Sequence, residues 1–233
     1  MASVIGRYLK ETRRPVYSAA LVLPFFLVYH TGTLFLKTTY VNGADALITQ
    51  LLSLLSVRSA LASAVVLLLC FIAWQVRTRA PWKIEAPKLA ALFAESCLFA
   101  FLLFALLGWL GTHLSPAAAG ARSPGMIERL ILYCGAGIYE ELVFRGFLLG
   151  FLILAFTHVA GMRSGAAAFW GTLLAALIFS AFHYVGPAGD EFTLASFGQR
   201  AFGGLYFSIL FVTRGFGVTA ASHALYDMLV GLG

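Results

Sequence analysis

The chain has 233 residues, of which 61% are hydrophobic and 11% charged, and its mean hydropathy is +0.89. Soluble domains use apolar residues at about half of their positions and charged residues at about a quarter, so this composition excludes an ordinary soluble domain and predicts a polytopic membrane protein. The net charge of +6 could suit a nucleic-acid-binding protein, but the basic residues cluster at the ends of apolar runs. Membrane topology explains that pattern better.

Apolar stretches of about 17 to 25 residues, long enough to span a bilayer, recur along the chain. They predict seven spans, of which the fourth is unusually long: Val16–Leu36, Ser59–Val76, Lys88–Gly111, Ile127–Phe156, Ala166–Val185, Ala195–Val212 and Phe216–Leu232. The segment Asp45–Val57 is apolar but too short to span. It is compatible with an interfacial helix, a re-entrant segment or an eighth span.

The apolarity is continuous within each stretch rather than alternating, which excludes a closed β-barrel. The predicted fold class is all-α: a polytopic transmembrane helix bundle of about seven to eight spans that encloses a polar cavity. With a cytoplasmic N-terminus, ten basic residues fall on the cytoplasmic side, most of them in segments 7–14 and 77–88, and five on the other side. The positive-inside rule therefore predicts that orientation, and we expect a bacterial inner-membrane protein. The three cysteines lie inside apolar segments without paired spacing, so no disulfide framework is predicted.

The fourth span carries three ionisable residues in the sequence YEELVFRGFLLG (Tyr139–Gly150). An ionised side chain at the bilayer centre costs about 2.5 to 3.5 kcal/mol on insertion scales, so each should face the bundle interior or a water-filled cavity. Glu141 and Arg145 are four residues apart, share one helix face and can neutralise each other. Glu140 is rotated by about 100° from Glu141 in an α-helix, so its partner must come from another helix.

Two later spans offer such partners. Phe179 and His183 are four residues apart on the fifth span, as are His223 and Asp227 on the last. Each spacing places both residues on one helix face, so polar atoms from three helices can converge on one cavity. Small residues near these positions would let the backbones approach closely: Gly135, Ala136, Gly137, Gly203 and Gly204.

Structural roles compete with chemical ones for these residues. A buried pair such as Glu141 and Arg145 often only specifies packing, and a single intramembrane histidine often only joins helices by a hydrogen bond. We expect His30, His113 and His158, which lie near span ends, to be interfacial or loop residues. Glu95 on the third span either lines the same cavity or stays hydrated near the membrane surface.

The joint pattern is more specific than its parts. The chain resembles the CPBP family of intramembrane proteases, because three motifs follow one another in the same order on successive apolar helices. They are EExxxR (Glu140–Arg145), FxxxH (Phe179–His183) and HxxxD (His223–Asp227). That family includes CAAX prenyl endopeptidases of the Rce1 type and bacterial Abi proteins. The resemblance begins at about Ile127 and continues to the end of the chain. It divides the single membrane domain into unassigned N-terminal helices at 1–125 and CPBP-like catalytic helices at 126–233.

The resemblance implies an intramembrane endopeptidase that acts on a membrane-attached substrate, either a prenylated CAAX-like tail or a C-terminal membrane sorting segment. It implies that Glu140 and His183 activate a water and that His223 and Asp227 hold the oxyanion. Glu141, Arg145 and Phe179 would be supporting residues.

Asp227 stands where the family often has asparagine, and an ionised carboxylate cannot donate a hydrogen bond to an oxyanion. Asp227 is therefore protonated, orients and charges His223, or serves a metal. We favour the second of these roles.

No cofactor is favoured. A zinc-dependent metalloprotease is one alternative, because one carboxylate and two histidines, here Glu140, His183 and His223, can also bind a catalytic zinc. The expected partners are a membrane-attached peptide or protein and the lipid bilayer, not nucleic acid. A small transporter or proton-relay protein is another alternative, because buried carboxylates and histidines also build ion paths. No internal repeat of the kind common in transporters is visible.

Overall fold

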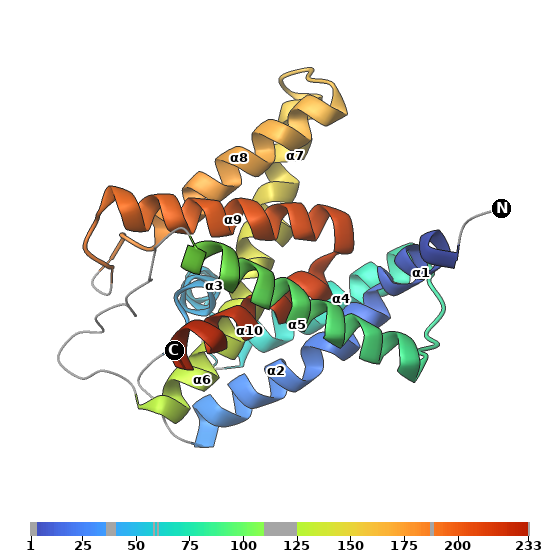
Figure 1. Cartoon of the computed structure of the whole chain (residues 1–233), viewed down its shortest axis with the longest axis horizontal. Coiled ribbons are helices and arrows are strands. Elements are labelled where there is room, and N and C mark those ends of the chain that lie inside the picture. The colour runs from blue at the N-terminus through green and yellow to red at the C-terminus, as the bar shows by residue number, and fades with distance from the viewer. Residues whose placement is uncertain are drawn as a thin grey trace.

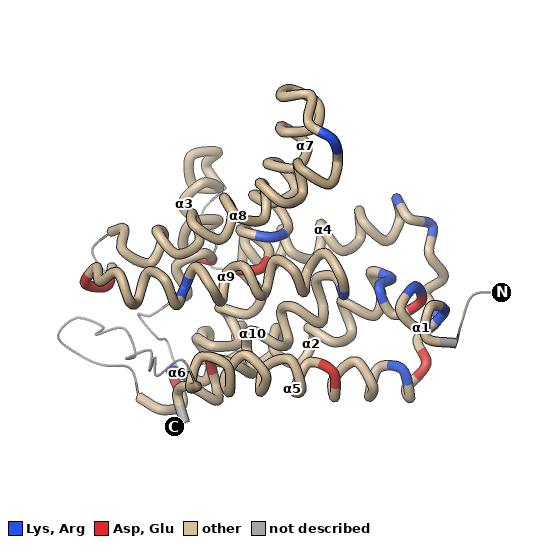
Figure 2. Tube along the Cα trace, turned by 45° about the horizontal axis from the view of Figure 1, so that its top comes forward, with Lys and Arg blue, Asp and Glu red and all other residues tan. Residues whose placement is uncertain are grey.

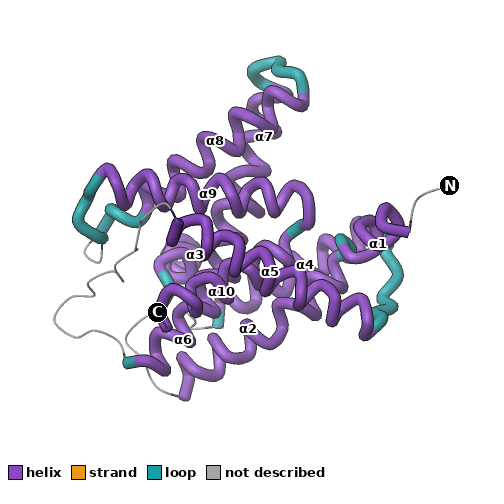
Figure 3. The backbone as a smooth tube through the Cα atoms, in the orientation of Figure 1, coloured by secondary structure: helices purple, strands orange, loops and turns teal. Residues whose placement is uncertain are grey.

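The computed structural model describes residues 4–35, 41–57, 59, 61–109, 125–186 and 189–232, and all regular elements in this part of the chain are helical (Figures 1 and 3). The predicted all-α fold class is therefore confirmed. In chain order the elements are α1 (Val4–Thr12), α2 (Pro15–Phe35), α3 (Gly43–Leu54), α4 (Ala62–Thr78), α5 (Ala86–Trp109), α6 (Met126–Gly135), the π-helix η1 (Ala136–Leu149), α7 (Gly150–His158), α8 (Ser164–Phe182), α9 (Leu194–Arg214) and α10 (Phe216–Leu232).

The predicted spans fall on these helices, but their number stays a prediction. By length and composition, three of the described helices are long and apolar enough to cross a membrane, namely α2, α5 and α8, while α3 and α4 are shorter apolar helices. Three positions named in the sequence analysis lie outside the described residues: the predicted span ends Leu36 and Gly111, and His113. The short segment after Asp45 belongs to α3, a helix of 12 residues.

Helix α10 lies at the centre of the bundle, where it packs against α2, α5, α6, α9 and η1. Buried side chains of these helices, such as Tyr29, Leu103 and Tyr139, form the main apolar core. Helices α7 and α8 run side by side and project from the rest of the molecule (Figure 1). The helix that carries His223 is therefore the most enclosed one.

Basic residues gather at the end of the bundle where α1, the C-terminus of α4 and the N-terminus of α5 meet (Figure 2). There Lys88 lies 2.5 Å from Glu11 and 2.9 Å from Glu85. The hydrogen bond from the Lys88 ammonium lowers the pKa of the Glu11 carboxyl below its ordinary value. This gathering agrees with the expectation that segments 7–14 and 77–88 share one side of a membrane, while the cytoplasmic orientation stays a prediction.

Glu95 contacts residues of two other helices and is not among the residues of the predicted site. Its carboxylate accepts hydrogen bonds from the Tyr8 hydroxyl at 2.6 Å and from Arg214 Nε at 2.8 Å. Burial, together with the Glu95 carboxylate, raises the pKa of Tyr8 to about 12. The half-buried position of Glu95 is thus explained by an ion pair with Arg214 that joins α5 to α9 and by a hydrogen bond from Tyr8 of α1.

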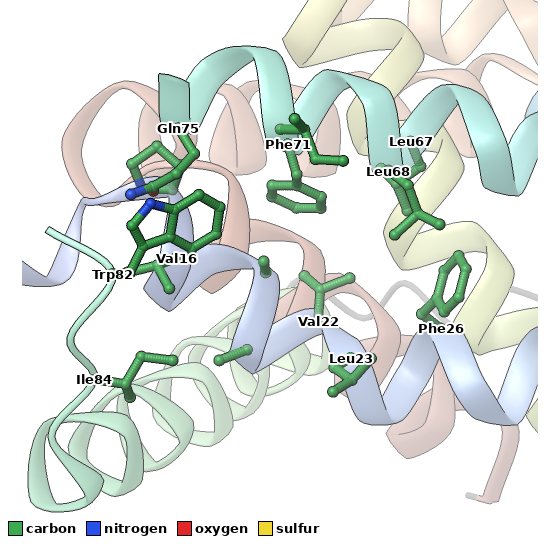
Figure 4. A pocket seen from close by; sticks show the side chains of 14 residues that line it. Val16, Val22, Leu23, Phe26, Leu67, Leu68, Phe71, Gln75, Trp82 and Ile84 are labelled. Carbon is green, nitrogen blue, oxygen red and sulfur yellow. The ribbon is translucent and has the colours of Figure 1, made fainter. Parts of the chain in front are cut away.

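An apolar groove of about 350 Å³ lies between α2 and α4 (Figure 4). Trp82 and Ile84 line one end of it, and Phe26 and Leu68 line the other (Figure 4). A second groove of about 230 Å³ shares lining residues of α4 with the first and reaches Leu142 and Gly146 of η1. Apolar surface therefore extends along α4 to the helix of the glutamates.

Helices α6, η1 and α7 form one unbroken segment, because the residues at both junctions keep right-handed helical backbone angles. The long fourth predicted span is thus a continuous helix, but its middle 14 residues are π-helical. In a π-helix the hydrogen bonds run from i to i+5, so each turn holds more residues and successive side chains diverge by less than 100°. The prediction of an α-helical 100° separation between Glu140 and Glu141 is therefore wrong, and both side chains are buried.

Gly137 sets the distance between η1 and α10. A Cβ atom there would lie 2.5 Å from the Ala220 carbonyl oxygen and 2.7 Å from Ala224 Cβ. Gly135 and Gly204 also meet close neighbours, whereas a Cβ at Gly203 would find nothing within 4 Å. The expectation of close approach at small residues is met at Gly135, Gly137 and Gly204 and not at Gly203.

Gly137→Ala is expected to push η1 away from α10 and to lower the free energy of unfolding by about 1 to 3 kcal/mol. Gly150→Ala on the same helical segment is the matched control, because a Cβ there meets nothing within 4 Å. Alanine should raise stability at that position by up to about 1 kcal/mol, since glycine loses more conformational freedom in a helix. Thermal midpoints in detergent compare the two variants, and equal midpoints would contradict the close packing.

Candidate active site

Three elements bring four predicted site residues together. Oε2 of Glu140 on η1 lies 4.0 Å from Nε2 of His183 and 3.9 Å from Nε2 of His223. Oδ2 of Asp227 lies 3.6 Å from the same nitrogen of His223. The Glu140 and His223 side chains are mostly buried, whereas those of His183 and Asp227 keep 25% and 21% exposure. The polar atoms of η1, α10 and the end of α8 thus face one another.

His183 directly follows α8, and the FxxxH spacing fixes its ring. Its Nδ1 lies 2.9 Å from the Phe179 carbonyl oxygen. Because a carbonyl can only accept, Nδ1 carries the hydrogen, and Nε2 of the neutral ring keeps its lone pair. The nitrogen that can accept a proton is therefore the one that lies near Glu140.

His223 is fixed by two neighbours on other helices. Its Nδ1 donates to Oε1 of Glu141 at 2.7 Å, and the ring of Phe207 stacks on the imidazole with 4.5 Å between ring centroids. Nε2 is left to face Glu140 and Asp227. In the sequence, Glu141 was interpreted only as the partner of Arg145, and neither its bond to His223 nor the contact of Phe207 was predicted.

Arg145 neutralises Glu141 inside the bundle. Its NH1 donates to Oε1 of Glu141 at 2.9 Å, and the two side chains keep only 1% and 0% exposure. Its NH2 donates to the Gly204 carbonyl oxygen at 3.1 Å, and the guanidinium lies 4.4 Å from the ring centroid of Phe179. The predicted i, i+4 pair is therefore present, and it also anchors α9 and packs against the end of α8.

Sequence reasoning missed two polar residues near Glu140. Asn42 precedes α3 and donates from Nδ2 to Oε1 of Glu140 at 2.8 Å. Its only signal in the sequence is an asparagine in front of an apolar helical run, which is typical of a helix N-cap. His30 was predicted to be an interfacial or loop residue, and the loop alternative is wrong: it is a buried residue of α2, with Nε2 2.6 Å from the Tyr139 hydroxyl. Its position near a span end misled the prediction, because η1 packs over that end of α2. His158, by contrast, is exposed at the end of α7.

The donor atoms of Glu140, His183 and His223 are of the types that zinc binds. In a tetrahedral zinc site with bonds of about 2.0 to 2.2 Å, ligand atoms lie about 3.4 Å apart. The observed separations from Glu140 are 3.9 and 4.0 Å. Within the described part of the chain, no group of three or more His, Cys, Asp or Glu side chains is arranged to hold a metal ion. The separations from Glu140 are wider than the ligand spacing of a tetrahedral zinc site, and the choice between a metal-free and a metal-dependent site belongs to the proposal below.

The apolar helices fit an integral membrane protein, and the bundle brings a cluster of carboxylates and histidines together. Residues 122–229 match the family model described as type II CAAX prenyl endopeptidase Rce1-like. This range contains all of the predicted polar site residues, namely Glu140, Glu141, Arg145, His183, His223 and Asp227, so the family match confirms the resemblance of this part of the chain. Neither the curated proteins nor the solved structures give a match to the chain.

Arg145→Ala is expected to leave the Glu141 carboxylate buried without its cation and to lower the free energy of unfolding by about 3 to 5 kcal/mol. The double variant with Glu141→Ala should be more stable than Arg145→Ala alone, because both charges leave together. Thermal midpoints and detergent-extracted yields measure this difference. If the double variant is no more stable, the pairing does not carry the stability assigned to it.

Proposed function

We propose that this protein is an intramembrane endopeptidase that hydrolyses a peptide bond of a membrane-attached substrate by means of a water activated by Glu140 and His183. The supporting observation is the separation of 4.0 Å between Oε2 of Glu140 and Nε2 of His183. One water can bridge two such atoms with hydrogen bonds of about 2.8 Å to each. The bridging water would have two groups able to accept its protons.

In the proposed reaction, Glu140 takes a proton from the water while His183 accepts the second hydrogen bond and orients it. The water oxygen attacks the carbonyl carbon of the substrate, and the carbonyl oxygen becomes an oxyanion. Glu140 then passes the proton to the leaving nitrogen, so the carbon–nitrogen bond breaks and the carboxylate is restored. Both steps use groups of this chain alone.

His223 would stabilise the oxyanion. With Nδ1 donating to Glu141, its Nε2 is the nitrogen left to point a hydrogen at the developing charge when the ring is protonated. Such a preorganised donor in a site with little water lowers the barrier strongly. In this proposal Glu141, and not Asp227 as the sequence suggested, orients the His223 ring. Asp227 would add a second negative charge beside the imidazolium, with its Oδ2 3.6 Å from Nε2 of His223.

The substrate forms a further part of the proposal. A prenylated CAAX-like tail is favoured by the family description of residues 122–229. The apolar grooves along α4, which reach Leu142 and Gly146, offer surface to a prenyl chain. A C-terminal membrane sorting segment is the alternative substrate. A cleavage assay in proteoliposomes distinguishes the two substrates by comparing a farnesylated CAAX peptide, an unmodified CAAX peptide and a membrane-spanning peptide. We expect the farnesylated peptide to be preferred.

Glu140→Gln is expected to reduce peptide cleavage by about a thousandfold or more, since general-base contributions reach about 10²- to 10⁴-fold and glutamine cannot accept the proton. Its thermal midpoint should stay close to that of the wild type, because the side chain is nearly isosteric. Glu128→Gln is the matched control: Glu128 accepts from the Gly125 N–H at the start of the same helical segment, and glutamine can do the same.

A well-folded Glu140→Gln variant that still cleaves peptide would remove Glu140 from the role of base. The same assay with 1,10-phenanthroline tests the metal alternative, and full activity in its presence is expected. Loss of activity that zinc restores would favour the metalloprotease.

Asp227→Asn is expected to keep the fold and to retain activity within about tenfold, because Glu141 still holds His223 and the new amide can donate to the oxyanion. Asp227→Leu, of similar size but without a polar group, should lose much more. Initial rates of purified variants at saturating peptide make the comparison. Equal losses in Asn and Leu would show that the charge of Asp227 itself is required.

A further inference from the structure

Asn42 lies outside the segment that matches the family, yet its side chain reaches the proposed base. Its Nδ2 donates to Oε1 of Glu140 at 2.8 Å, across 98 residues of sequence. We propose that Asn42 is a positioning residue that fixes the Glu140 carboxylate so that Oε2 faces the histidines. This inference rests on the proposed function and extends the site into the N-terminal half of the chain.

The orientation of the Asn42 amide is fixed by helix α3. Asn42 is the N-cap of α3, and its Oδ1 accepts from the backbone N–H groups of Ala44 at 2.9 Å and Asp45 at 3.4 Å. Because the cap occupies the oxygen, the NH₂ group is the part of the amide left for Glu140. One side chain therefore starts a helix and holds a carboxylate.

The start of α3 is itself anchored to α2. Oδ2 of Asp45 accepts from the Tyr29 hydroxyl at 2.5 Å, and the Tyr29 oxygen accepts from the Asn42 N–H at 3.3 Å. Tyr29 and Asp45 are buried. On η1, Tyr139 precedes Glu140 and bonds to His30 of α2. Asn42, Tyr29 and Asp45 thus form a hydrogen-bonded set that joins α2 to α3 and reaches Glu140 of η1.

A neutral amide suits a base better than a cation would. Glu141 is paired with the guanidinium of Arg145, which neutralises its charge. Glu140 instead bonds to an uncharged donor at one oxygen, which restricts its rotamer without neutralising it. This contrast gives the two adjacent glutamates different tasks. It also gives a role to α3, the apolar helix too short to span a membrane.

The test compares three residues at position 42 that all cap helices about equally well, namely Asn, Asp and Ser. Asn42→Ser keeps a cap but removes the donor to Glu140, and kcat for a farnesylated CAAX peptide should fall by about tenfold or more, with KM little changed. Asn42→Asp keeps cap and size but places an acceptor against the Glu140 carboxylate. Its kcat should fall furthest. A purely structural cap would leave Asp as active as Ser or Asn.

Ser53→Ala, at the other end of α3, is the matched control, because it removes only a hydrogen bond to the Gln50 carbonyl. Its kcat should equal that of the wild type. A double-mutant cycle of Asn42→Ser and Glu140→Ala in thermal unfolding tests the contact without using activity, because alanine removes the acceptor for the Asn42 amide. Non-additive midpoints support the inference. Additive midpoints, or an Asp variant with wild-type kcat, would overturn it. A wild-type protein that cleaves no peptide would refute the proposed function, and the cycle would then decide whether Asn42 holds Glu140.

Discussion

A single buried oxygen, Oε1 of Glu141, accepts hydrogen bonds from Arg145 NH1 at 2.9 Å and from His223 Nδ1 at 2.7 Å. A charge buried in this way destabilises a protein unless an opposite charge pairs with it. The pair therefore constrains the helices around it: Arg145 binds Gly204 of α9, and His223 belongs to the central helix α10. With Nδ1 fixed, Nε2 of His223 faces Glu140. This one carboxylate therefore fixes His223 in the candidate site.

The two neighbouring glutamates lie on the π-helix η1, and both are buried. One meets a guanidinium and the other an amide. π-Helical hydrogen bonds are rare and usually limited to one turn, often at functional sites. The tight contact of Gly137 with α10 holds this unusual segment against the helix that carries His223.

Sequence patterns predicted what depends on local spacing. The i, i+4 pairs Glu141–Arg145, Phe179–His183 and His223–Asp227 are all in contact, and continuous apolarity predicted the all-α bundle. The contacts that could not be predicted join distant segments: Asn42 meets Glu140 across 98 residues, and Glu95 meets Arg214 across 119. Such contacts depend on how helices pack, which no local pattern encodes. The π-helix could not be predicted either, because segment 136–149 is apolar at most positions and carries no periodic pattern that shows the number of residues per turn.

The central claim is that Glu140 and His183 act on the water while His223 receives the oxyanion. A structure of the wild-type protein with a peptide phosphonate, whose tetrahedral phosphorus mimics the attacked carbon, tests it most directly. The account predicts one phosphonyl oxygen within hydrogen-bond distance of Nε2 of His223 and the other within that distance of Oε2 of Glu140. A phosphonate that binds in the protein but contacts neither atom, or that is held by a metal ion between them, would contradict it.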